Sequence, residues 1–151
     1  MANWAEFAAA APAIAAAGRR LLYRSETGEA LLSTVRGDGL PRIHPIYVAI
    51  LEDRLVAFLL RSPKAIDLVE DGRFALHAHQ DPAAPHEFLL RGRARVIDDE
   101  ATRARFASAW SFTVDDDNDL FEFLVEHAVF GERGSPDDWP PRYRSWRSPG
   151  A

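Results

Sequence analysis

The chain has no cysteine, and only one of its 18 basic residues, Lys64, is a lysine. The absence of cysteine excludes disulfides, cysteine-based metal sites and thiol nucleophiles, and it is compatible with a reducing cytosol. The scarcity of lysine is a weaker signal, because GC-rich coding alone can deplete it. It nevertheless makes the neighbourhood of Lys64 the first place to look for function.

The chain also lacks an apolar run long enough to span a membrane. Ala8 to Ala17 is apolar but is mostly alanine, and Arg19 and Arg20 follow it instead of preceding it as they would in a signal peptide. We therefore expect a soluble, cytoplasmic protein without a membrane partner. The formal net charge of -5 argues against nucleic acid as the main partner.

What remains is the composition of an ordinary globular protein, with 47% hydrophobic, 27% charged and 11% aromatic residues. A chain of 151 residues corresponds to one domain and buries roughly 70% of its unfolded surface. A core of that size needs no metal or disulfide. We expect a single domain over residues 1–151.

Periodicity predicts mostly strands after a helical start. Apolar residues recur at helical spacing over residues 3–23, and Pro12 is expected to divide this segment into two helices. Alternating or apolar runs predict strands over 29–35, 41–50, 54–60, 73–79, 87–97, 120–129 and 142–147.

Turns and caps delimit these elements. Asp38-Gly39 predicts a tight hairpin, since both residues tolerate positive φ, and Glu52-Asp53 turns the chain again. Serine and proline at 62 and 63 open a short helix to Val69, and Asp98 and Asp99 can cap a helix that ends near Trp110. Six or seven strands with helices at the start and at two crossovers predict an α+β fold with an antiparallel barrel, which removes exposed sheet edges.

The start of the short helix has the chemistry of an anion site. Ser62 is a favoured N-cap, and the free N–H groups of the first turn attract negative charge, as does Lys64. The preceding hairpin can bring Arg42 to the same point, and its planar guanidinium binds phosphate oxygens in pairs. Together these residues would form a phosphate clamp. The alternative is an ordinary helix start with solvated Arg42 and Lys64.

At this point the sequence resembles a known family, the pyridoxamine 5′-phosphate oxidase-like flavin-binding split barrels. The resemblance is carried by the joint pattern DG-x-PR-x-HP over residues 38–45, followed by S-x-K over residues 62–64. Residues 72–77 and 89–94 fit the strands that follow in this family. The similarity is good over residues 28–97 and holds only in outline elsewhere.

The resemblance implies a six- to seven-stranded antiparallel split β-barrel with flanking helices, a homodimer, and an FMN bound at the dimer interface. Arg42, Ser62 and Lys64 would hold the FMN phosphate. The isoalloxazine ring would lie along His44, Pro45 and Ile46, with Thr34 and Glu87 also close to the cofactor. A proline at position 45 fits a strand edge, where a ladder hydrogen bond is missing.

The sequence also departs from the oxidase itself. Tyr47 stands where the true oxidases resemble one another in having a lysine. Their C-terminal substrate motif of arginine and histidine has no counterpart here, and Arg142 to Arg147 is only distantly similar to it. Vitamin B6 oxidation is therefore not supported, and the substrate and catalytic residues stay unassigned. We expect an FMN-binding oxidoreductase. Coenzyme F420-dependent reduction, a non-catalytic flavin or haem binder, and a barrel without cofactor are the alternatives.

Other candidate sites are weaker. His77 and His79 would point the same way on a strand, but no third ligand has a short fixed spacing, so a metal site is not expected. The acidic residues from Asp115 to Glu126 have the spacing of a calcium loop, yet Leu120 occupies the position that requires glycine. The four tryptophans are expected in the core or at a dimer interface: Trp4, Trp110, Trp139 and Trp146.

Overall fold

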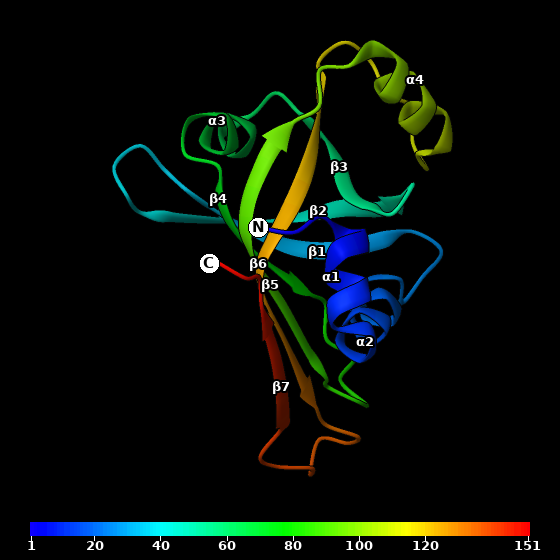
Figure 1. The fold of residues 1–151 in the computed structure, drawn as a ribbon, viewed down its shortest axis with the longest axis vertical. Coiled ribbons are helices and arrows are strands. Elements are labelled where there is room, and N and C mark those ends of the chain that lie inside the picture. Colours follow the sequence, from blue (N-terminus) through cyan, green and yellow to red (C-terminus); the bar gives the residue numbers. More distant parts are fainter.

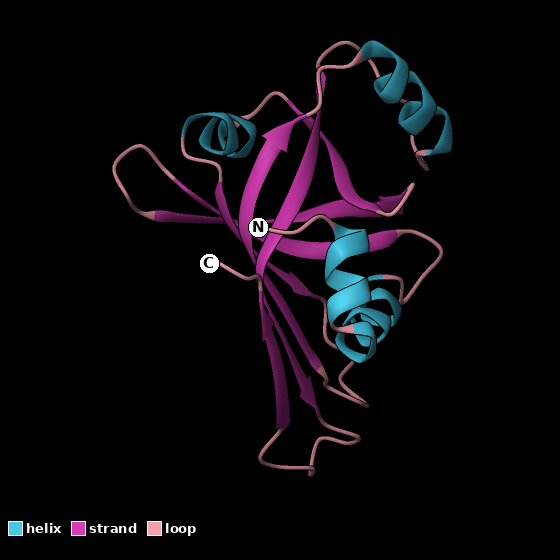
Figure 2. Cartoon of the chain, viewed as in Figure 1, coloured by secondary structure: helices cyan, strands magenta, loops and turns pink.

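A computed structural model describes all residues, Met1–Ala151, as one sheet with helices around it (Figures 1 and 2). The helices are α1 (Trp4–Ala10), α2 (Pro12–Leu22), α3 (Pro63–Glu70) and α4 (Glu100–Ala109). The strands are β1 (Gly28–Val35), β2 (Pro41–Leu51), β3 (Arg54–Leu60), β4 (Arg73–Ala78), β5 (Glu87–Val96), β6 (Asn118–Glu132) and β7 (Arg142–Arg147). None of the helices has the length and apolar character that crossing a membrane requires.

The sheet closes on itself. Its strand order is β3-β2-β1-β4-β5-β6-β7, and an additional antiparallel pairing of β3 with β6 joins six strands into a barrel, while β7 stays outside it. The predicted elements agree with the structure to within two residues, except β6, which is 15 residues long. Its first residues pair with β3 and its last with β7, so β6 extends beyond the predicted segment at both ends. The predicted α+β split barrel is confirmed.

The N-terminal helices cover the barrel interior. Asn3 and Glu6 form a reciprocal capping box at the start of α1, and Pro12 begins α2 at the predicted break. The inward face of α2 packs on the strands so closely that a Cβ on Gly18 would lie 2.1 Å from the ring of Phe88. A glycine is needed there because Phe88 fills the space under the helix.

The core combines these helices with one face of each barrel strand. Residues of β1 alternate between buried and half-buried, as expected for a strand with one face in the core. Fully buried phenylalanines supply most of the large side chains: Phe7, Phe88, Phe121 and Phe123 in the main cluster, and Phe106 in a smaller one under α4. Trp4 is buried with them, whereas Trp139 is 70% exposed.

The two predicted hairpin turns are present, but they differ in which residues have a positive φ. Between β1 and β2 only Gly39 has a positive φ, of 84°, and Asp38 does not use this freedom. Between β2 and β3, by contrast, Glu52 and Asp53 both lie in the left-handed region, with φ of 46° and 57°. A two-residue hairpin needs this conformation, although neither residue is the glycine or asparagine that usually supplies it.

Candidate functional site

Arg42 is held in place by a buried carboxylate. Arg42 faces Thr34 across the β1–β2 ladder, and α3 packs over this pair. The Arg42 Nε donates to Asp67 Oδ2 over 2.9 Å, and the Thr34 hydroxyl donates to the same oxygen over 2.7 Å. Thr34 and Asp67 are buried, but the Arg42 side chain keeps 29% exposure. Its two terminal nitrogens make no hydrogen bond within the chain.

The charge state of Asp67 follows from this geometry. Burial acts to raise the pKa of Asp67, but the hydrogen bonds from Thr34 and Arg42, aided by the charges of Arg42 and Arg36, outweigh it. The pKa of Asp67 therefore lies below its ordinary value, and the carboxylate is ionised at neutral pH. Asp67 neutralises part of the charge of Arg42 and fixes its direction.

The N-terminus of α3 lies next to this group. Ser62 is the N-cap, but its side chain does not cap the helix; instead Ser62 Oγ accepts a hydrogen bond from Lys64 Nζ over 3.3 Å. The backbone N–H of Ile66 bonds back to Ser62, and those of Lys64 and Ala65 have no partner. Lys64 and Asp67 are three positions apart and share a face of α3. Through its bond to Asp67, Arg42 lies against the same helix that Ser62 and Lys64 begin. That these three residues bind one phosphate stays a prediction.

One edge of β2 is open beside this clamp. β2 pairs with β1 along most of its length but with β3 only over Ala49–Leu51. The prediction that Pro45 occupies a strand edge is therefore confirmed, since its missing N–H removes no ladder bond there. An open pocket of about 290 Å³ is lined by Glu29, Pro45, Ile46, Tyr47 and His79. It lies on the outward face of β2 and β1, opposite to the face that carries Arg42 and Thr34, because Tyr47 pairs with Glu29 across the ladder. His44 is half-buried on the same face of β2 as Arg42.

Glu87 lies away from the clamp within one chain. The row that contains Arg42 and Thr34 continues through Phe74 to Gly92 on β5. Glu87 is the first residue of β5, roughly 17 Å along the strand from that row. There a hydrogen bond to Glu87, with smaller contributions from desolvation and the Glu87 charge, raises the pKa of Tyr143 on β7. A contact between Glu87 and a cofactor stays a prediction.

Sequence reasoning missed two residues of this site. Asp67 is buried against Arg42, and Arg36 acts on Asp67 through its charge. A signal for Asp67 was present, because an acid three positions after Lys64 shares its helix face. Nothing in the sequence said that this face would meet Thr34 and not solvent.

Comparison with known proteins shows which solved structures have a similar fold. No protein-family model and no curated protein matches the chain, but solved structures do. A haem-binding protein from Mycobacterium smegmatis has a TM-score of 0.64 at 20% identity, over 87% of this chain and 57% of that one. A protein from Clostridium acetobutylicum, related to general stress protein 26 of B. subtilis and of the pyridoxinephosphate oxidase family, has a TM-score of 0.66 at 13% identity, over 87% and 92%.

A third structure, the haem storage protein HutZ of Vibrio cholerae, has a TM-score of 0.58 at 15% identity, over 71% of this chain and 87% of that one. At such identities the likeness concerns the path of the chain and not the ligand. It agrees with the closed six-stranded barrel and its extra strand. The chain has the split-barrel fold of the pyridoxamine 5′-phosphate oxidase-like proteins.

Proposed function

We propose that this protein is an FMN-binding oxidoreductase that acts on a small molecule, and that it works as a homodimer. The observation that carries the proposal is the pairing of Arg42 with buried Asp67, which leaves its terminal nitrogens free beside the uncapped N-terminus of α3. An arginine that merely covered the surface would not need a buried acid to orient it.

The residues at α3 fit a phosphate. Two unpartnered backbone N–H groups, the Lys64 ammonium and the free end of Arg42 are all donors, and the only acid among them is already bonded to Arg42. The helix dipole adds to their effect. Arg42, Ser62 and Lys64 would hold the phosphate of FMN, and Thr34 would act indirectly by bonding Asp67.

The open edge of β2 fits the flat ring. Its free backbone groups between Pro41 and Val48 would position an isoalloxazine. The flavin would supply hydride or electron transfer, and the protein would orient it and tune it by hydrogen bonds. His44 would add a polar contact from the same strand. No side chain here is assigned as a catalytic acid.

A second copy of the chain would complete the site. The face of β2 that points away from the core carries Ile43, Pro45 and Tyr47, and Leu31 lies directly opposite Pro45 on β1. Ile43 is 65% exposed, and the exposed ring of Tyr47 packs on that of Phe112 at 4.5 Å. Apolar surface of this kind marks an interface, and it borders the open edge of β2 that would hold the ring.

The test is the visible absorption of the purified protein after addition of FMN, followed by gel filtration. Lys64→Ala and Arg42→Ala should each weaken FMN binding at least tenfold, about 1.4 kcal/mol, because each removes a charge-assisted phosphate contact. Lys64→Ala is the cleaner variant, since Arg42→Ala also leaves Asp67 unpaired. Arg24→Gln, which removes an exposed cation without a partner, should change nothing. Equal FMN affinity in wild type and both clamp variants would refute the assignment.

Haem is the second candidate, because two proteins of the same fold are described as haem-binding and haem-storing. F420, whose tail also carries a phosphate, would use the same clamp as FMN. Titrations with F420 and with haem therefore accompany the FMN titration. Haem binding that survives Lys64→Ala, without FMN binding, would favour a haem protein.

A further inference from the structure

A second cavity, of about 520 Å³, lies between α2 and the far end of the β6–β7 hairpin. It takes no residue from β2 or α3. In Figure 1, α3 and α2 lie on opposite sides of the view. Its apolar walls are small alanines of α2, including Ala13 and Ala16, and the ring of Phe130 on β6. The volume is within the range of sites for small organic molecules.

Two guanidinium groups at this cavity have little to bind within the chain. Arg20 projects from α2 and makes no hydrogen bond or ion pair. Arg144 on β7 reaches only Glu132, at 3.4 Å, and lies over the ring of Phe130 at 5.8 Å. Guanidinium groups bind carboxylates through pairs of parallel hydrogen bonds. Arg20, which has no partner, and Arg144, whose single ion pair is long, can therefore both donate to an acidic ligand.

His86 adds a third donor. Its Nδ1 accepts a hydrogen bond from the backbone N–H of Arg133 over 3.0 Å, which places the proton of a neutral ring on Nε2. The ring also stacks against Phe130, with 5.8 Å between centroids. A protonated Nε2 is a hydrogen-bond donor and not a metal ligand. His86 therefore favours an anion in this cavity over an iron centre.

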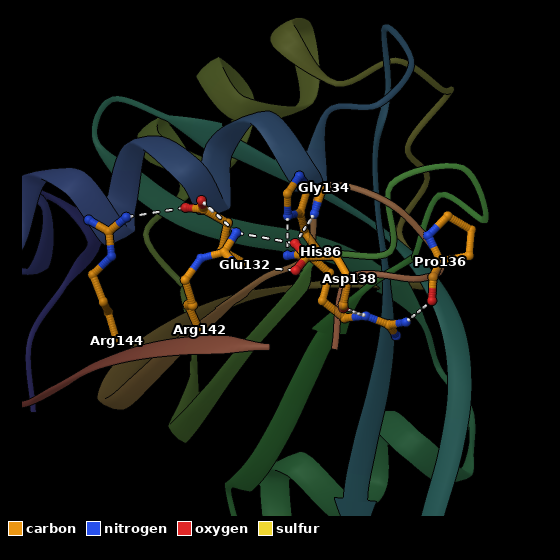
Figure 3. A network of polar contacts seen from close by, with 8 residues as sticks. His86, Glu132, Gly134, Pro136, Asp138, Arg142 and Arg144 are labelled. Carbon is orange, nitrogen blue, oxygen red and sulfur yellow. Dashed lines mark hydrogen bonds and ion pairs between the residues drawn. The ribbon is translucent and has the colours of Figure 1, made fainter. Parts of the chain in front are cut away.

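Glu132 is the one acid in the cavity wall, and its charge is already shared. It bonds Arg142 at 3.3 Å as well as Arg144, and Arg142 is also bonded to Asp138 (Figure 3). Arg133 fixes the loop behind these residues by donating to the carbonyls of Pro136 and Asp138. The wall is thus braced independently of any ligand, and the lining keeps an excess of positive charge.

We propose that this cavity is a binding site for a small organic acid, with a carboxylate held by Arg20, Arg144 and His86 and a flat apolar body held between Phe130 and the alanines of α2. The charged end of such a ligand meets hydrogen-bond donors, and its apolar end meets apolar side chains. The alanines leave the room that larger side chains on α2 would fill.

The test is isothermal titration calorimetry of the full chain with 1-naphthoate, and with 1-naphthamide, which has a similar shape without the charge. Naphthoate should bind at least tenfold more tightly than the amide. The double variant R20Q/R144Q should lose at least tenfold in naphthoate affinity, and Ala16→Leu, which fills the cavity from an exposed helical position, should abolish binding. Arg24→Gln replaces an exposed arginine just beyond the end of α2 that makes no hydrogen bond or ion pair; it is the matched control and should bind as wild type does.

Thermal unfolding of each variant shows whether the fold is retained, and it should be, since Glu132 keeps Arg142 when Arg144 is replaced. Equal affinity for the acid and the amide would overturn the proposal, as would no binding of naphthoate at millimolar concentration. Binding that persists in Ala16→Leu would place the acid elsewhere and would also overturn it. Since none of these residues belongs to the α3 clamp, the result is independent of whether FMN binds.

Discussion

Asp67→Asn tests whether the α3 clamp depends on a buried carboxylate. The substitution keeps the size of the side chain and removes its charge. In the wild type, Asp67 Oδ2 accepts from the Thr34 hydroxyl and from Arg42 Nε, and only 6% of the side chain is exposed. An amide oxygen in the same place can still accept from both donors, but it carries no charge, so both bonds are weaker and Arg42 loses its counter-charge.

The expected loss of stability follows from these two bonds. A hydrogen bond to a charged group contributes about 1.5–3 kcal/mol and a neutral one about 0.5–1.5 kcal/mol. Each bond therefore weakens by about 1 kcal/mol, and Asp67→Asn should destabilise the protein by about 2 kcal/mol. Full loss of a buried pair would cost more, but the partly exposed Arg42 can turn to water. In a chain of this length the melting temperature should fall by about 4–8 °C.

Measuring FMN affinity as well as thermal unfolding separates the role of Asp67 in positioning Arg42 from its role in stability. Without the carboxylate, Arg42 is no longer directed to the α3 N-terminus, so FMN affinity should fall about tenfold, or about 1.4 kcal/mol. Thermal unfolding and an FMN titration at a temperature well below both transitions measure the two effects. Asp71→Asn, at the other end of the same helix in an exposed pair with Arg73, is the control and should leave FMN affinity unchanged.

Two outcomes would refute this reasoning. If Asp67→Asn unfolds at the wild-type temperature, the carboxylate does not contribute the charged bonds that the geometry indicates. If it is destabilised but binds FMN as wild type does, Asp67 is a structural residue and the free end of Arg42 is not part of a phosphate site. If Asp71→Asn weakens FMN binding as much as Asp67→Asn does, the loss is not specific to the carboxylate that bonds Arg42, and the phosphate-site assignment is likewise refuted.

Two further predictions concern the barrel. Gly92→Ala should prevent folding or cost about 3 kcal/mol or more, since its Cβ would lie 1.9 Å from the Leu124 carbonyl oxygen at the β5–β6 bulge; urea unfolding measures this. Glu122→Gln should cost about 3 kcal/mol at pH 7, because it removes the charge of a buried carboxylate that pairs with the half-buried Arg54 and the exposed Arg95. Burial raises the pKa of Glu122, but these arginines outweigh it and lower the pKa overall, so its stabilisation exists above the unfolded-state pKa, near ~4.3, and is lost as the pH falls through the folded value. Unfolding measured from pH 7 down to pH 3 should therefore show a shallower acid loss in Glu122→Gln than in wild type; parallel curves would contradict the assignment.

The barrel could be predicted because its local signals agree with one another. Proline at 12 and at 63 begins a helix in each case, and alternation locates the strands within two residues. The register of β6 with both β3 and β5 could not be predicted in the same way. It depends on closure of the whole sheet, which aligns Val56 and Arg95 with the same residue, Glu122. No pattern within β6 alone says that it has two partners.

The candidate site was predictable only in part, for a related reason. Ser62 and Lys64 are neighbours in sequence, so their chemistry is visible in one motif. The group that orients Arg42 comes from 25 residues away and is recognisable only when Asp67 is seen to be buried. The cavity at α2 is harder still, because its donors Arg20, His86 and Arg144 come from three distant segments and resemble ordinary surface residues until the fold brings them together.

The way the barrel closes accounts for the position of the proposed cofactor site. β3 pairs with β6 along most of its length and with β2 over only three residues, so closure of the barrel leaves Pro41–Val48 of β2 without a second neighbour. Unpaired strand edges are normally protected, and here no strand of the same chain pairs with this one. The edge carries a proline and exposed apolar side chains, which suit a flat ligand and a second protomer more than water. If both cover the same edge, each buries surface that the other would otherwise expose, and cofactor binding and dimerisation stabilise one another.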